Sequence, residues 1–159
     1  MNKEKLAPAL GKLVSGLYII SLKNGDEEAG FLASWVQQAG FEPPMVTIAF
    51  NKERKKHFEL LTASGKLVIN IMAKENGKTM SRFFKPAPET GSIFDELETF
   101  TGESGLPILK DSLGYLEAKY HTEIESGDHI IVLAEITGGD INDDKLEPST
   151  HVRPDGFKY

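Results

Sequence analysis

Residues 17–36 read LYIISLKNGDEEAGFLASWV and carry the clearest structural signal in the chain. Two apolar segments, 17–22 and 29–36, flank the dipeptide Asn24-Gly25. Glycine adopts the positive φ that a type I′ turn requires, and Asn-Gly between apolar segments is a strong short-range hairpin signal. The stretch therefore predicts a β-hairpin.

The chain after this hairpin alternates between strands and short helices. Pro43-Pro44 cannot donate hydrogen bonds to a sheet, so residues 40–44 are expected to form a rigid loop before a strand at 45–50. Residues 53–64 have a helical pattern that Gly65 ends, and residues 67–72 follow as a buried strand. A second short helix is expected at 76–84, ended by Pro86, and the loop from there to Leu109 is expected on the surface.

The C-terminal half contains a second long hairpin. Apolar and polar residues alternate over 116–124, which predicts a half-exposed strand with Glu117 facing outward. A turn at 126–128 leads into an apolar strand at 129–136. About six strands and two short helices favour a β-barrel, which removes exposed sheet edges. The tail, 138–159, is expected to be too polar for the core.

Composition limits the possible functions. The chain has 159 residues, a formal net charge of −6 and no cysteine. Its length is that of one domain. Because it has no cysteine, it cannot form disulfides or thiolate metal sites. Its negative charge makes a nucleic-acid partner unexpected. No apolar run approaches the roughly 20 residues that cross a bilayer, and no secretory signal is found, so a cytoplasmic location is expected. The sequence also contains no G-x-G-x-x-G motif, no P-loop motif and no histidine spacing typical of metal ligands. No metal site is therefore expected.

Cations gather where the first predicted helix begins. Lys52, Arg54, Lys55 and Lys56 surround the lone Glu53, although cations at a helix N-terminus oppose the helix dipole. A bound phosphate would explain them, because the free N–H groups of a first helical turn bind anions. The alternative is a solvated lysine run.

Two further segments carry unusual residues. Residues 33–44, ASWVQQAGFEPP, contain the only tryptophan, Trp35, followed by Gln37 and Gln38. Amides offer both a donor and an acceptor, which suits a flat polar heterocycle, although Trp35 could equally be a core residue. Gly127-Asp128-His129 places an imidazole at the start of a strand, where it is either a site residue or a structural histidine.

These three segments together resemble the flavin-reductase-like family, which has the FMN-binding split-barrel fold. The resemblance covers roughly residues 10–141. Ser-Trp-Val-x-Gln is similar to the reductase modules fused to flavodiiron proteins and to those of high-molecular-weight rubredoxins, and Gly-Asp-His matches a family motif associated with nicotinamide docking. Arg153, Gly156 and Tyr159 resemble a C-terminal family pattern, although Pro154 replaces its lysine.

The resemblance implies a cofactor, a reaction and an assembly. FMN would be held by Ala33, Ser34, Trp35, Val36, Gln37, Gln38, Phe50, Asn51, Lys52 and Lys56. His129 would seat the nicotinamide of NADH or NADPH, whose electrons would pass through FMN to an iron protein or flavoprotein partner. Residues 1–145 would form the FMN-binding domain of a homodimer, with 146–159 as a tail in the same domain or its interface. The alternatives are a non-enzymatic carrier similar to flavoredoxin and, more remotely, a flavin-binding relative that oxidises another substrate.

Overall fold

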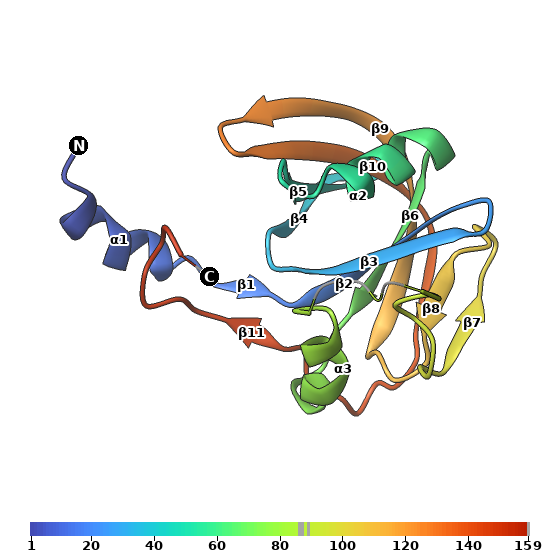
Figure 1. The fold of residues 1–159 in the computed structure, drawn as a ribbon. Helices are drawn as coiled ribbons and strands as arrows, with labels where there is room; N and C mark the ends of the chain where they lie inside the picture. The colour runs from blue at the N-terminus through green and yellow to red at the C-terminus, as the bar shows by residue number, and fades with distance from the viewer. Residues whose placement is uncertain (86–87, 89, 159) are drawn as a thin grey trace.

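The computed structural model describes residues 1–85, 88 and 90–158. Its main feature is a seven-stranded antiparallel sheet with the strand order β3-β2-β6-β9-β10-β5-β4 (Figure 1). The seven strands are β2 (Tyr18–Asn24), β3 (Glu27–Ala33), β4 (Val36–Phe41), β5 (Pro44–Asn51), β6 (Lys66–Ile71), β9 (Gly114–Ser126) and β10 (His129–Ile141). The fold is mainly β, as the sequence predicted.

The two ends of this sheet are neighbours in the chain. β3 and β4 lie at opposite ends of the strand order, yet only Ser34 and Trp35 separate them. The sheet must therefore curl until its two edges approach each other, which produces a barrel that is split at this point. We call the junction of β3, Ser34-Trp35 and β4 the seam.

The predicted hairpin is confirmed, with its turn one residue further on. Asn24 pairs with Glu27, so the two loop residues are Gly25 and Asp26, and Gly25 has a φ of 60°. The second hairpin is also confirmed, because β9 pairs with β10 from His129–Ser126 onward.

The barrel interior is apolar and is closed by α2 (Lys55–Ser64). Leu60 and Leu61 of this helix are buried together with Ile20, Ile48 and Phe50 of the sheet. Each such side chain contributes about 1.5–3 kcal/mol on burial. The helix ends where predicted, at Gly65, which adopts the left-handed conformation with a φ of 67°.

The predicted rigid loop at 40–44 is wrong. Val36–Phe41 forms strand β4 along β5, and Phe41 pairs with Pro44, so only residues 42 and 43 turn. Pro44 is tolerated because it is the first residue of β5 and lies beyond Met45, the last residue that pairs with β10.

The predicted surface loop before Leu109 is also wrong. After the 3₁₀ turn Lys74–Asn76 and α3 (Gly77–Arg82), the chain forms a small sheet from β7 (Thr99–Thr101) and β8 (Pro107–Leu109). Ile93, Phe94 and Ile108 are buried there, because isolated apolar residues between turns still reach the core. The expected helix stop at Pro86 lies outside the described residues.

The alternation predicted for β9 holds only in part. Ile124 is 67% exposed because the tip of the β9–β10 hairpin extends beyond the barrel. Glu117 is 5% exposed, and its Oε1 accepts a hydrogen bond of 2.8 Å from the Ser104 backbone N–H. Bulges at 133/134 and 136/138 of β10 change the register, so one simple alternation cannot describe this hairpin.

The two ends of the chain pack together as an arm beside the barrel (Figure 1). The helix α1 (Lys3–Gly11), which the sequence analysis did not predict, contacts residues 153–156, and β1 (Ser15–Gly16) pairs with β11 (Thr150–His151). Arg153 and Ser149 are buried, so the tail is not the purely exposed segment that was expected. Within the described part of the chain, no helix has the length and apolar character needed to span a membrane.

Candidate functional site

A pocket of about 320 Å³ opens at the seam. Its walls are mostly apolar, and they include five of the residues that the sequence predicted for the site. These are Ala33, Ser34, Trp35, Asn51 and His129. Residues from β3, the seam, β5 and β10 therefore meet as the sequence analysis expected. A ligand pocket with apolar walls and a few placed polar groups is the usual form of a small-molecule site.

Ser34 is the most informative residue in this seam pocket. It is 5% exposed, and its Oγ has no hydrogen-bond partner among the described residues. Leaving a buried hydroxyl unpaired costs about 1–3 kcal/mol, so such a group calls for a ligand. Ser34 lines both the seam pocket and a neighbouring pocket of about 590 Å³. The polar edge of a flavin ring fits this requirement, because it carries both donors and acceptors.

His129 is held in place by two neighbours. Its Nδ1 lies 2.7 Å from Asp128 Oδ1, and its ring lies 4.8 Å from the Trp35 ring, centroid to centroid. The hydrogen bond to His129 lowers the pKa of the Asp128 carboxyl. A carboxylate on Nδ1 fixes the orientation of the ring and leaves Nε2 for other contacts. The Arg153 guanidinium lies 5.2 Å from the centre of the Trp35 ring, so the indole contacts both a cation and the imidazole.

A second pocket, of about 490 Å³, lies at the start of α2. Arg54 and Phe84 line both this pocket and the seam pocket, so the two are continuous. Arg54, Lys55 and Lys56 bring three cations to the first turn of the helix. Arg54, the N-cap, makes no side-chain capping hydrogen bond. A helix N-terminus and three cations lining one pocket are the features of an anion site.

His57 also lines this α2 pocket, and the sequence analysis gave it no role. Its Nε2 lies 3.4 Å from the Gly30 carbonyl oxygen, whereas its buried Nδ1 has no partner among the described residues. Burial is the largest cause that lowers the pKa of His57, followed by the charge of Arg54.

Not all of the predicted binding residues face these two pockets. Phe50 is 1% exposed and packs in the barrel core, while Val36 and Gln37 line the 590 Å³ pocket instead. Gln38 is exposed and donates to the Gly40 carbonyl oxygen at 3.3 Å. Their roles in binding stay predictions.

The two lysines predicted to bind phosphate already have partners. Lys52 Nζ lies 3.1 Å from Glu125 Oε2, and Lys56 Nζ lies 2.6 Å from Glu27 Oε1. Lys56 lines the α2 pocket, and Arg54 lines both pockets, although Arg54 was recognised only as part of the cationic run. His151 and Phe84 also line the seam pocket and were missed, because no local motif marks them.

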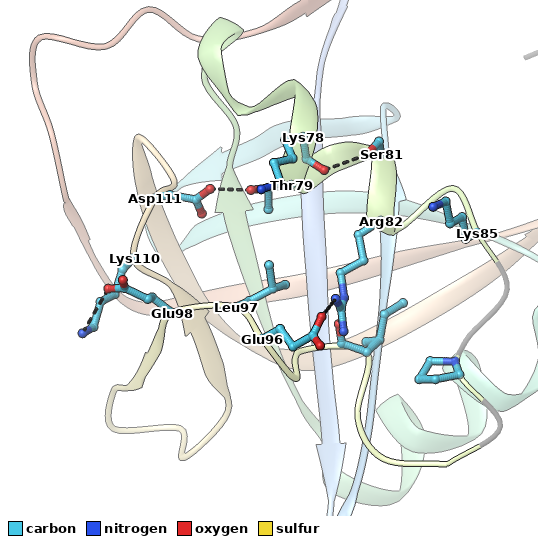
Figure 2. Close-up of a pocket in the computed structure, with 12 residues that line it drawn as sticks. Lys78, Thr79, Ser81, Arg82, Lys85, Glu96, Leu97, Glu98, Lys110 and Asp111 are labelled. Carbon is cyan, nitrogen blue, oxygen red and sulfur yellow. Dashed lines mark hydrogen bonds and ion pairs between the residues drawn. The ribbon is translucent and has the colours of Figure 1, made fainter.

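The largest pocket, about 950 Å³, lies between α3 and the β7–β8 sheet (Figure 2). Most of its charged groups contact one another: Arg82 pairs with Glu96 at 3.4 Å and Lys110 with Glu98 at 3.8 Å. Figure 2 also shows Thr79 directed at Asp111, to which it donates a hydrogen bond. Neither of the unpartnered buried atoms found in the described residues lines it, so it is a weaker candidate for a cofactor.

Comparison with known proteins shows the family of the chain. The family model for the flavin reductase like domain matches residues 10–157, and the chain belongs to this family. Diflavin flavoprotein A 1 of Synechocystis is 36% identical over 155 residues, which cover 97% of this chain and 27% of that protein. The chain therefore spans about a quarter of the length of the curated relatives it matches.

Solved structures share the same fold. The NADH:FAD oxidoreductase SgcE6 of Streptomyces globisporus superposes with a TM-score of 0.83 at 24% identity, covering 99% of this chain and 91% of that one. The flavin reductase HpaC, solved with NADP⁺, has a TM-score of 0.80 at 27% identity and covers 94% and 92% of the two chains. Both likenesses support the split-barrel assignment.

Proposed function

We propose that the protein is an NAD(P)H:flavin oxidoreductase that holds FMN in the seam and α2 pockets and passes electrons on to a partner protein. One observation carries the proposal: the buried Ser34 Oγ has no partner among the described residues, in a pocket that also contains Trp35 and His129. The family membership of the chain supports the same reaction, as do the names of its relatives, diflavin flavoproteins and flavin reductases.

The seam residues would bind the ring of the flavin. Ser34 Oγ would exchange a hydrogen bond with the polar edge of the ring, which would satisfy the buried hydroxyl. Asn51 Oδ1 already accepts from the Glu53 backbone N–H at 2.8 Å, so its amide Nδ2 is the group that would donate to the ring. Ala33 and Phe31 would supply apolar contact, and Trp35 would form one wall.

The α2 pocket would bind the phosphate. Arg54 and Lys56 line it beside the first turn of the helix, and Lys52 could join them only by leaving Glu125. One helix N-terminus supplies one anion site, which matches the single phosphate of FMN.

His129 would position the reductant. When bound, FMN supplies the redox chemistry, accepting a hydride equivalent from a nicotinamide. Asp128 and Trp35 fix the imidazole at the edge of the seam pocket, where it can hold the nicotinamide amide or a phosphate of NADH or NADPH. The role is one of docking and needs no proton transfer by the imidazole.

The assembly is part of the same proposal. Residues 1–145 would form the flavin domain and 146–159 would complete it or its interface in a homodimer. Leu13 and Val14 are each 67% exposed and line the 590 Å³ pocket beside Trp35, which is the kind of apolar surface that a second copy would cover. A cytoplasmic location stays a prediction.

Anaerobic mixing of the FMN-loaded protein with NADH and with NADPH tests the reaction. Rapid bleaching of the visible flavin band is expected for one or both. The alternative, a flavoredoxin-like carrier, shares the fold and most site residues, and it would bleach only with a reduced protein partner. Slow bleaching with both nucleotides would therefore overturn the enzyme and favour the carrier.

A further inference from the structure

Basic side chains surround the mouth of the proposed flavin site. Lys85 and Ile93 line both the α2 pocket and the large pocket of Figure 2, so these two hollows form one continuous surface, which we call the basic face. Its cations are Arg54, Lys55, Lys56, Lys78, Arg82, Lys85 and Lys110. Four carboxylates line it as well, so its described residues carry a net charge of +3, whereas the whole chain carries −6.

Part of this positive charge has no counterion among the residues that the structure describes. Three of the cations are ion-paired. Arg82 pairs with Glu96, Lys110 with Glu98, and Lys56 with Glu27. Lys55, Lys78 and Lys85 are exposed, and no carboxylate of the described residues lies within ion-pair distance of them. These three lysines come from different elements, α2, α3 and the segment after α3, so they face solvent over a surface broader than one pocket.

An exposed aromatic residue lines this surface where it meets the seam pocket. Phe84 is 71% exposed and lines the wall shared by the seam pocket and the α2 pocket. Lys85 follows it in the chain, and Arg54 lines the same two pockets. Protein interfaces combine exposed apolar side chains with charged ones, and small, weak interfaces serve electron-transfer encounters.

We propose that the basic face docks a small acidic one-electron carrier protein. The inference rests on the proposed function, because the partner would exchange electrons with the flavin held at the seam. NAD(P)H would lose a hydride, that is two electrons and a proton. Two molecules of oxidised carrier would then each take one electron, so the products are NAD(P)⁺, two reduced carriers and one proton released to solvent.

The distribution of charge over this protein indicates that the partner is acidic. A protein of net −6 repels another acidic protein from most directions. The basic face is the exception, and complementary patches steer encounters, raising association rates by about 10- to 1000-fold at low salt. The partner would approach with its redox centre toward Phe84, next to the seam pocket. Exposed lysines on the rim act mainly on the association rate.

Charge reversal of two lysines tests the proposal. Lys78→Glu with Lys110→Glu reverses the net charge of the face at two lysines that line the large pocket and neither the α2 pocket nor the seam pocket. The matched control is Lys145→Glu with Lys158→Glu, since both lysines are exposed and line none of the pockets described above. The FMN-loaded proteins are reduced chemically and mixed with oxidised rubredoxin, an acidic iron protein, and with cytochrome c, a basic one.

The face-reversed protein should reduce rubredoxin at least about 10-fold more slowly than the control at low ionic strength. The wild-type rate should fall with salt, and the rate of the face-reversed protein should not. Equal rates and equal salt slopes for the two variants would overturn the proposal. So would a face reversal that slows the reduction of cytochrome c as much as that of rubredoxin.

A binding measurement separates this proposal from the proposed function. Redox-inactive zinc rubredoxin is titrated into flavin-free and FMN-loaded protein, so the result depends on neither hydride transfer nor bound flavin. Binding that the face reversal weakens supports the docking surface even if NAD(P)H fails to reduce the flavin. Equally tight binding of a duplex oligonucleotide would show a general polyanion surface and would overturn the protein partner.

Discussion

The imidazole of His129 lies against the indole of Trp35, with the ring centroids 4.8 Å apart and the planes inclined by 49°. His129 begins β10, and Trp35 joins β3 to β4. The contact therefore connects the seam to the β9–β10 hairpin. Asp128 fixes the imidazole from one side and Arg153 lies over the indole. Four residues from three parts of the chain thus position one wall of the proposed site.

Ser34→Ala should weaken FMN binding and should not destabilise the flavin-free protein. A neutral hydrogen bond contributes about 0.5–1.5 kcal/mol, which corresponds to a loss of about 2- to 10-fold in affinity. Removing an unpaired buried hydroxyl should leave the free energy of unfolding unchanged or higher. Flavin titration and urea denaturation measure the two effects.

Ser112→Ala is the matched control for this prediction. Ser112 is also buried, but its Oγ donates to the Leu109 carbonyl oxygen at 2.7 Å. The variant should lose about 1–3 kcal/mol of stability, because a buried polar group loses its partner, and should keep its FMN affinity. If both serine variants behave alike, the special role of Ser34 is wrong.

His129→Ala should slow reduction by NAD(P)H at least about 10-fold while FMN binding changes little. The reason is that the imidazole docks the reductant and the flavin contacts lie elsewhere in the seam. Stopped-flow bleaching with increasing nucleotide separates the effect on binding from the effect on the rate. His121→Ala, at an exposed position on the hairpin, should resemble the wild type.

Arg54→Gln with Lys56→Gln should weaken FMN binding by about 100-fold or more, since charge-assisted hydrogen bonds contribute about 1.5–3 kcal/mol each. Riboflavin, which lacks the phosphate, should bind the wild type and the variant equally. Lys52→Gln should have a smaller effect, because Lys52 lines neither the α2 pocket nor the seam pocket. Unchanged FMN affinity in Arg54→Gln/Lys56→Gln would remove the phosphate from the start of α2.

His57 should make the flavin-free protein less stable in mild acid. Burial and the neighbouring cations lower its folded pKa, so the unfolded chain binds the proton first as the pH falls. The free energy of unfolding should therefore decrease from about pH 6.5 downward and level off below the folded pKa. His57→Gln should remove this component, and parallel stability curves for the two proteins would contradict it.

The parts of the fold that the sequence predicts are those set by local chemistry. Asn24-Gly25 requires a turn and Gly65 ends a helix, because few other residues adopt their conformations. The loop predicted at 40–44 is wrong because proline is compatible with a strand when it is the first residue, as Pro44 is in β5. The surface loop predicted before Leu109 is also wrong. The buried residues of this segment are separated by turns, so they show neither helical nor strand periodicity.

The sequence predicted several residues that line the seam pocket, but it did not predict how they are arranged. Ser34, Trp35, Asn51 and His129 stand in recognisable segments, and the structure brings them together around one pocket. The missing partner of Ser34 Oγ cannot be read from the sequence, because it depends on how three strands pack. The pairing of Lys52 with Glu125 is equally invisible, since the two residues meet only when β5 and the hairpin come together.

Titration of the flavin-free protein with FMN, followed by tryptophan emission, tests the central claim most directly. Trp35 is the only tryptophan of the chain and lines the seam pocket, so a bound flavin must lie beside it. We expect strong quenching that saturates at one FMN per chain. Unchanged emission, with no flavin retained by the protein, would contradict the account.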